Sequence, residues 1–225
     1  MLTQDAETEP QTATKNSFAE AYLPLYHGPL VSIRLEPAGP TYQLAKALLC
    51  KKSPYFLKMF ESNLTEAKML SATLQEGTHT CKHTFELFIE WLYTGKFTLL
   101  REDRSNSFSR HLDLAIFADM SLVGDLTDCV AMSLEQTIKA DRDMNSKRET
   151  PYWPPDRHYS IRDIKAEHFA SVDRLPSGST VRRVFLIVLV EPYLRNTEFK
   201  FASEIVRYPR IGTDLLAAVK RLCLG

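Results

Sequence analysis

YQLAKALLCKKSPYF (residues 42–56) and FELFIEWLYTG (residues 85–95) are the two segments that decide the fold of this chain. In the first, apolar residues recur at i, i+3 and i+4, the spacing of one helix face. This helix is expected to stop before Pro54, because the residue that precedes a proline avoids the helical region. Ser53 can cap a second helix that begins at Pro54, where the missing N–H costs nothing.

The second segment carries the most regular amphipathic pattern of the chain. Its apolar residues keep the positions i, i+3, i+4, i+7 and i+8, and they are Phe85, Phe88, Ile89, Leu92 and Tyr93. Gly95 follows them, where a left-handed C-terminal cap is useful. Between the two segments, alternating apolar residues at 70, 72 and 74 predict a short strand.

A β-hairpin is expected ahead of the first segment. Apolar and polar residues alternate over residues 31–36, which is the period of a half-buried strand. Residues 38–40, Ala-Gly-Pro, supply a turn, and residues 41–44 can return as the second strand. Together with the helices, these strands predict an α+β unit whose core includes the following residues: Leu35, Leu48, Phe56, Phe60, Phe88, Ile89, Leu92 and Ala115.

After the second segment the pattern is helical. Residues 101–110 are polar and predict a loop, residues 111–120 predict a buried helix, and residues 126–138 predict another that ends near Asp141. Charges and prolines then dominate residues 142–160, which indicates a linker.

The remainder, residues 161–225, is expected to form an α+β extension. A helix is predicted over 161–169 and another over 214–223. Periodicity leaves open whether the apolar run 181–190 is a buried helix or a strand; Ser179 and Thr180 ahead of it favour a helix, and Pro192 is expected to end it.

Composition and charge exclude several classes of function. Lys plus Arg and Asp plus Glu number 28 each, so the formal net charge is zero and the clustered cations that bind nucleic acid are lacking. The longest apolar run, residues 184–190, is too short to span a membrane. Four widely spaced cysteines and an N-terminus without a signal-peptide pattern predict a cytoplasmic or nuclear protein with reduced thiols. Residues 1–17 are too polar to pack and are expected to be disordered.

No set of residues in the sequence predicts an enzyme. His79, Cys81 and His83 are metal-ligand types, but zinc needs four ligands and no second pair accompanies them. Asp113 and Asp119 with His111 could form an acid–base set, but they fall on a helix of core character. No nucleophile elbow, phosphate-binding loop or dinucleotide motif is present, so we expect no catalysis, no metal and no cofactor.

The two opening segments, with residues 112–119 (LDLAIFAD), resemble the BTB/POZ domain over about residues 28–141. The resemblance implies a small mixed sheet flanked by a cluster of helices, in an α+β fold used for self-association or partner binding. The expected organisation is therefore a disordered segment (1–17), a BTB/POZ domain (18–141), a linker (142–160) and an extension (161–225). Ser179 to Arg183 in the extension resemble a tail common in fungal members of the family.

Two positions depart from the family pattern. Ala45 stands where a histidine is usual, and Pro29 or Leu30 stands near the usual aspartate. The aspartate helps to line the dimer groove of the family's transcriptional repressors, so the departure argues against that corepressor role. It also predicts that the chain is monomeric or self-associates weakly.

The resemblance places a candidate partner site at Leu64, Thr65 and Glu66. In members that bind a cullin, an apolar residue, any residue and a glutamate follow a helix end like that at residues 59–61. Two interpretations stay open: Leu64 anchors a cullin, or it caps the core while Glu66 is solvated. The function implied is that of an adaptor that recruits a cullin-type ubiquitin ligase. The alternative is a self-associating scaffold of a transcriptional or other regulatory complex.

Overall fold

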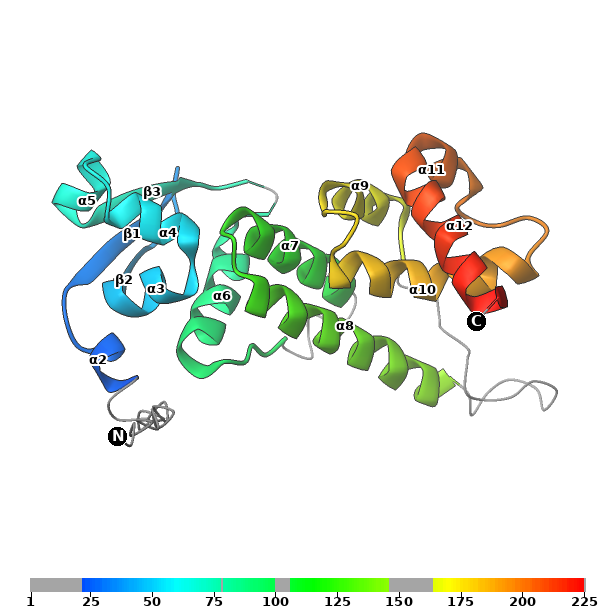
Figure 1. Ribbon diagram of the computed structural model, residues 1–225, viewed down its shortest axis with the longest axis horizontal. Helices are drawn as coiled ribbons and strands as arrows, with labels where there is room; N and C mark the ends of the chain where they lie inside the picture. Colours follow the sequence, from blue (N-terminus) through cyan, green and yellow to red (C-terminus); the bar gives the residue numbers. More distant parts are fainter. Residues whose placement is uncertain (1–21, 78, 100–105, 146–163, 225) are drawn as a thin grey trace, which may run out of the picture.

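The computed structural model describes residues 22–77, 79–99, 106–145 and 164–224. Its elements follow one another along the long axis of the molecule: the sheet with α2–α5 at one end, α6–α8 in the middle, and α9–α12 at the other end (Figure 1). The expected disordered segment, residues 1–17, lies outside the described residues. Among the described residues no helix is both long enough and apolar enough to cross a bilayer.

The sheet has three strands in the order β2-β1-β3, and it is mixed as expected. β1 (Leu30–Glu36) pairs antiparallel with β2 (Thr41–Ala45) and parallel with β3 (Ser71–Gln75). The hairpin turn requires Gly39, because a Cβ at this position would lie 2.5 Å from the Cβ of Leu35. A short helix that the sequence did not reveal, α2 (Leu23–Tyr26), precedes β1.

The helices of the first segment form as predicted. α3 (Lys46–Lys52) ends before Pro54, and α4 (Pro54–Phe60) begins there with the Ser53 hydroxyl accepting from the Phe56 N–H. The same hydroxyl donates to the backbone oxygen of Ser121 at 2.6 Å, which ties this corner to the turn after α7. α5 (Thr65–Met69) follows as a single turn that the sequence analysis missed.

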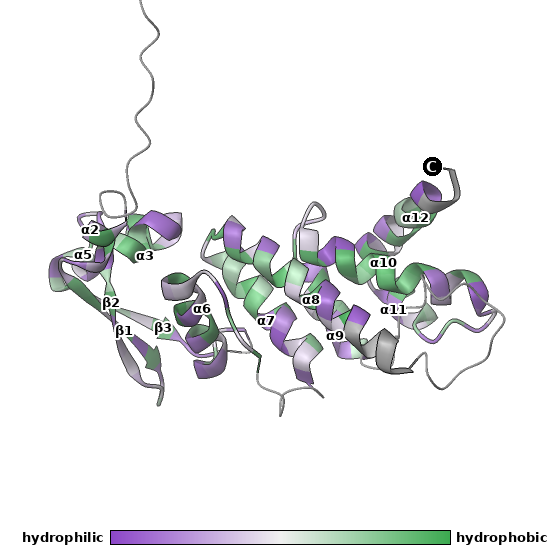
Figure 2. Ribbon diagram, turned by 90° about the horizontal axis from the view of Figure 1, so that it is seen from below, coloured by the Kyte–Doolittle hydropathy of each residue, from purple (hydrophilic) through white to green (hydrophobic). Residues whose placement is uncertain are grey.

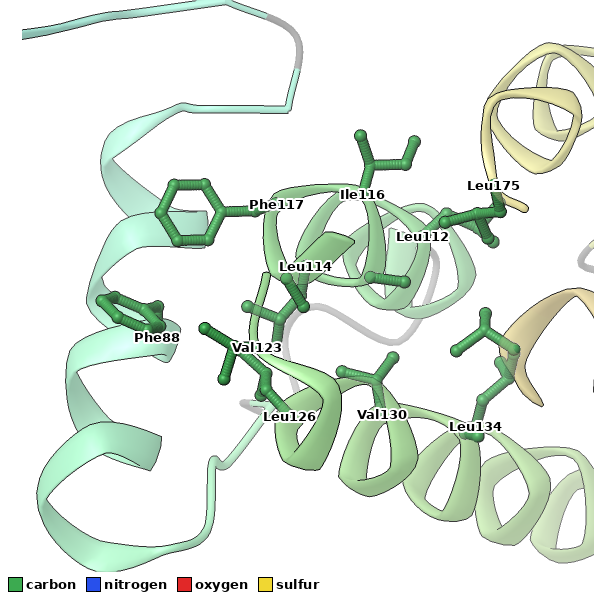
Figure 3. Packing of buried hydrophobic residues seen from close by; sticks show 14 of the residues in the cluster. Phe88, Leu112, Leu114, Ile116, Phe117, Val123, Leu126, Val130, Leu134 and Leu175 are labelled. Atoms are coloured by element: carbon green, nitrogen blue, oxygen red, sulfur yellow. The ribbon is translucent and has the colours of Figure 1, made fainter. Parts of the chain in front are cut away.

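The second segment is α6 (Lys82–Thr94), and Gly95 caps it with φ 72° as predicted. Phe88 of α6 packs against Phe117 of α7 with ring centroids 5.2 Å apart (Figure 3). The predicted core is confirmed, with Ile89 only partly buried; its members are Leu35, Leu48, Phe56, Phe60, Phe88, Ile89, Leu92 and Ala115.

α7 (Ser107–Met120) begins earlier than the predicted start at residue 111, so part of the expected loop 101–110 is helical. Phe108 explains the difference, because its ring is buried against His168 at 4.9 Å and Phe185 at 5.8 Å. α8 (Gly124–Asn145) likewise runs past Asp141. Residues 142–145 of the expected linker therefore belong to α8, and the rest of that linker lies outside the described residues.

The described residues 164–224 of the extension contain helices and no strand, so the expectation of an α+β extension is wrong in its β part. The helices are α9 (Ala166–Arg174), α10 (Thr180–Arg195), α11 (Ala202–Arg207) and α12 (Pro209–Leu224). α10 is apolar on most sides because it packs against both α8 and α12, and this burial hides the helical period in the sequence (Figure 2).

The boundaries of three helices in the extension also differ from the prediction. α10 continues past Pro192, whose backbone oxygen accepts from both the N–H and the side-chain amide of Asn196. α9 begins later than residue 161 and runs to Arg174, past the predicted end at residue 169; residues 161–163 lie outside the described residues. α12 starts at Pro209, five residues before the expected Asp214, and proline is tolerated at such a first position.

A fully buried cation joins three helices of the extension. Arg182 of α10 is 0% exposed, and its Nη2 lies 2.7 Å from the carboxylate of Asp214 on α12. Its Nη1 donates to the backbone oxygens of Val172 and Leu175, at the end of α9. The carboxylate of Asp214 thus neutralises the charge of Arg182, and the same guanidinium caps the C-terminal end of α9.

Replacing Phe88 by alanine tests the core. We expect Phe88→Ala to lower the free energy of unfolding by about 3–5 kcal/mol, since it removes a ring packed on several others. Chemical denaturation measures the change, and Met120→Ala, an exposed residue, is the control. An unchanged unfolding midpoint for Phe88→Ala would contradict the packing of α6.

Replacing Arg182 tests the extension. Arg182→Ala leaves Asp214 half-buried without its partner, so we expect a loss of about 3–5 kcal/mol in unfolding free energy. The adjacent Arg183 is exposed, and Arg183→Ala should change stability by less than about 0.5 kcal/mol. Equal effects of the two substitutions would show that the buried ion pair does not hold α9 and α12.

Candidate functional site

The predicted site residues lie on the connection between α4 and α5. α4 ends on Phe60, which is buried and stacks on Phe56, so the chain leaves the core at this point. The Ser62 hydroxyl then donates to the backbone oxygen of Met59 at 3.3 Å and accepts from the Leu64 N–H at 3.2 Å. These two hydrogen bonds give the connection a defined conformation.

The side chain of Leu64 is 55% exposed, so it does not close the core. Thr65 is also exposed and begins α5, while Glu66 in the same turn is half-buried. The chain thus presents an apolar side chain next to a carboxylate on an ordered loop. A partner that binds here could bury the leucine and place a backbone N–H or a cation opposite Glu66.

Two more exposed apolar side chains lie on the elements that flank the loop. Leu57 of α4 is 40% exposed and Met69 at the end of α5 is 70% exposed. We call Leu57, Leu64, Thr65, Glu66 and Met69 the α4–α5 surface. The sequence did not single out Leu57 or Met69: the exposure of Leu57 depends on which face of α4 is buried, and the single turn of α5 is too short to give a periodic signal.

The α4–α5 surface is held on both sides. α5 contacts α4, and it ends at Leu70, which adopts a left-handed conformation with φ 49°. The backbone oxygen of Leu70 then accepts from the Ser32 N–H of β1 at 2.8 Å, which anchors the chain to the sheet. The surface is therefore preformed, and binding to it requires little ordering of the backbone.

The groups considered for metal binding have structural contacts. His79 Nδ1 lies 2.8 Å from Asp113 Oδ1, which holds the segment before α6 against α7. Burial raises the pKa of the Asp113 carboxyl, and the hydrogen bond from His79 acts in the opposite direction. Cys81 contacts the hydroxyl of Thr84. Within the described ranges, no three His, Cys, Asp or Glu residues are grouped so that they could hold a metal ion.

The acid–base set considered for catalysis is separated in space. His111 is fully buried between α7 and α8, Asp113 is engaged with His79, and Asp119 is exposed. Burial also raises the pKa of the Cys50 thiol, which disfavours the nucleophilic thiolate. His111 and Asp113 therefore hold neighbouring segments together, and the α4–α5 surface is the candidate site.

Comparison with known proteins supports an interaction domain. The family model of the BTB/POZ domain matches residues 31–116. The match begins in β1 and ends within α7, so it contains the sheet, the α4–α5 surface and α6. The matched residues do not include α8 or the extension. The curated proteins contain no match to this chain.

The buried His111 predicts a loss of stability in acid. Its Nδ1 donates to the backbone oxygen of Ser107 and its Nε2 accepts from the Ser133 hydroxyl, so the folded state holds a neutral ring. Burial lowers its pKa from 6.5 to about 4, with the hydrogen bond to Ser107 opposing the shift. Below pH 6.5 the unfolded chain therefore binds a proton that the folded chain does not, and stability falls with pH down to about 4.

We expect His111 to remove about 2 kcal/mol of unfolding free energy between neutral pH and about pH 5. Urea titrations across this range measure the loss. The variant His111→Asn keeps an amide donor for Ser107 and does not titrate, so its stability should depend less on pH. If the wild type and His111→Asn followed parallel curves, the assigned neutral ring would be wrong.

Proposed function

Because the chain contains a BTB/POZ domain, and because this domain is a protein–protein interaction module, we propose that the protein is an adaptor that recruits a cullin-type ubiquitin ligase. The observation that carries the proposal is the exposure of Leu64, which ends the hydrogen-bonded α4–α5 connection directly before the turn of α5 that carries Glu66. In the sequence, the same pattern, an apolar residue two positions before a glutamate, resembles the one found in family members that bind a cullin.

The exposed side chain of Leu64 can supply binding free energy. A leucine that is already half-exposed in the free protein gains free energy when a partner covers it, about 25 cal/mol for each Å² of apolar surface. Leu57 and Met69 are further exposed apolar side chains on the two flanking helices, and Glu66 carries a carboxylate two residues after Leu64. A central apolar anchor with a polar rim is the usual composition of a protein interface.

Leu64→Ala tests the proposal directly. We expect the variant to weaken binding to a cullin N-terminal domain by about 2 kcal/mol, or about 30-fold, as measured by isothermal titration calorimetry. Its unfolding free energy should change by much less, because Leu64 is outside the core. Leu194→Ala is the matched control, since Leu194 is also 55% exposed but lies on α10.

Two results would overturn the proposal. One is that wild-type protein does not bind the cullin domain at all. The other is that Leu64→Ala and Leu194→Ala bind with the same affinity as the wild type, which would place the contact elsewhere. Glu66→Ala separates the contribution of the carboxylate.

A second candidate function, that of a self-associating scaffold, is favoured by a separate observation. Four large apolar residues near the start of β1 are exposed, and they are Tyr22, Leu23, Tyr26 and Leu30. The ring of Tyr26 lies 6.1 Å from that of Tyr93, and the Lys51 ammonium lies 4.8 Å from the centre of the Tyr22 ring. These contacts attach α2 to the domain while its outer side stays open.

Sedimentation velocity tests the scaffold. The small size of this apolar area predicts a monomer that dimerises weakly as concentration rises, and Leu23→Ser with Tyr26→Ser should weaken the association by about tenfold or more. A dimer that persists on dilution would refute weak association. An unchanged dissociation constant in the double variant would exclude this area as the contact.

A further inference from the structure

α12 at the end of the extension has one face buried and one face open. Ile211, Leu215 and Ala218 are buried on the side that meets the other helices of the extension. At 100° per residue, the opposite side covers an arc of about 140°. The six residues that we call the α12 outer face are all exposed, and they are Arg210, Thr213, Leu216, Ala217, Lys220 and Arg221.

The charges of the α12 outer face have a single sign. Its charged residues are Arg210, Lys220 and Arg221, and no acidic residue shares the arc. The acid of the same helix, Asp214, is turned inward and is committed to the buried Arg182. Among the described residues, neither Lys220 nor Arg221 forms an ion pair. Lys220 and Arg221 therefore form a positively charged end of the face that no ion pair among the described residues neutralises.

An apolar side chain lies between these cations. Leu216 is 58% exposed, and along the axis it lies about 9 Å from Arg210 and about 6 Å from Lys220. The Arg210 guanidinium is oriented by donating to the backbone oxygen of Asp173 at 3.0 Å. Ala217 beside Leu216 leaves room for a side chain of a partner. The face is thus an apolar centre with a cation at one end and two at the other.

From this arrangement we propose that the α12 outer face binds an acidic segment of a partner protein. The complementary segment carries carboxylates about 15 Å apart along its axis, which matches the separation of Arg210 and Lys220, with an apolar side chain between them. Opposite charges set the orientation and the on-rate, and burial of Leu216 supplies affinity. Three cations are few for a nucleic acid, and one leucine is little for a lipid surface.

The position of the α12 outer face would allow it to bind a partner while the α4–α5 surface is also occupied. Figure 1 shows α12 and α5 near opposite ends of the long axis, so the α12 outer face and the α4–α5 surface do not overlap. A scaffold bound at one end leaves the other end open for the acidic partner. This role as the recruiting surface of an adaptor rests on the proposed function, whereas binding of an acidic segment does not.

A fluorescence anisotropy titration of the full chain tests the inference. The probe is a labelled helical peptide of about five turns, with two glutamate pairs about 15 Å apart and one leucine midway. We expect saturable micromolar binding, weakened about tenfold or more by Lys220→Glu with Arg221→Glu, and about threefold or more by Leu216→Ser. Arg183→Glu and Leu194→Ser are the matched controls on α10, and they should bind like the wild type.

Further probes test whether the α12 outer face prefers a lipid surface or a nucleic acid to an acidic peptide. The same peptide with glutamine in place of leucine should bind at least about threefold more weakly. Vesicles of phosphatidylserine and a single-stranded oligonucleotide should bind more weakly than the peptide. The inference is overturned if the peptide does not saturate, if the charge-reversed variant binds it equally, or if vesicles or the oligonucleotide bind more tightly.

Cross-testing the variants separates this inference from the proposed function. Leu64→Ala should retain peptide binding, and Lys220→Glu with Arg221→Glu should retain cullin binding. If the wild type binds the peptide but does not bind the cullin, the ligase role is excluded and the acidic-segment site remains supported. Loss of peptide binding in Leu64→Ala would contradict two independent surfaces.

Discussion

The burial of α7 on both of its sides is the constraint on which the rest of the structure depends. One side carries Phe117, which meets Phe85 and Phe88 of α6. The other carries Phe108, which meets His168 of α9 and Phe185 of α10. A helix this apolar cannot face water on either side, so the BTB/POZ domain and the extension share one continuous core.

This shared core has consequences for how the extension is stabilised. The short helices α9 and α11 would be marginal alone, and they are held by contacts with longer helices. Arg182 adds directional hydrogen bonds to this packing, because its buried guanidinium donates to a carboxylate and to backbone carbonyl oxygens in a fixed geometry. The buried guanidinium therefore joins α9, α10 and α12 through polar contacts in addition to their apolar ones.

The continuous core in the middle of the molecule separates the α4–α5 surface from the α12 outer face (Figure 1). The α4–α5 surface is fixed by Ser62 and by the start of β3, and the α12 outer face is fixed by the buried side of its helix. Both surfaces combine exposed leucine with charge. In the adaptor proposed above, these two surfaces would bind separate partners.

Local sequence determined the elements that have a clear period or a defined cap. The hairpin, α3, α4 and α6 follow from alternation, from Pro54 after Ser53 and from Gly95, because each signal acts within a few residues. The candidate Leu64, Thr65 and Glu66 also came from local sequence, by resemblance. Their exposure could not be predicted in this way, because an exposed and a core-closing leucine have the same local pattern.

Only the tertiary structure decided the rest. The sequence favoured a helix over residues 181–190, and α10 confirms it, but the early start of α7 depends on contacts between segments far apart in the chain, and the continuation of α10 past Pro192 was not predicted. Arg182 looks like a surface cation in sequence, next to Arg183, and it is buried because Asp173 and Asp214 arrive from other helices. The α12 outer face likewise becomes visible only when packing shows which side of the helix stays open, since burial is a property of the assembled helices and not of any one of them.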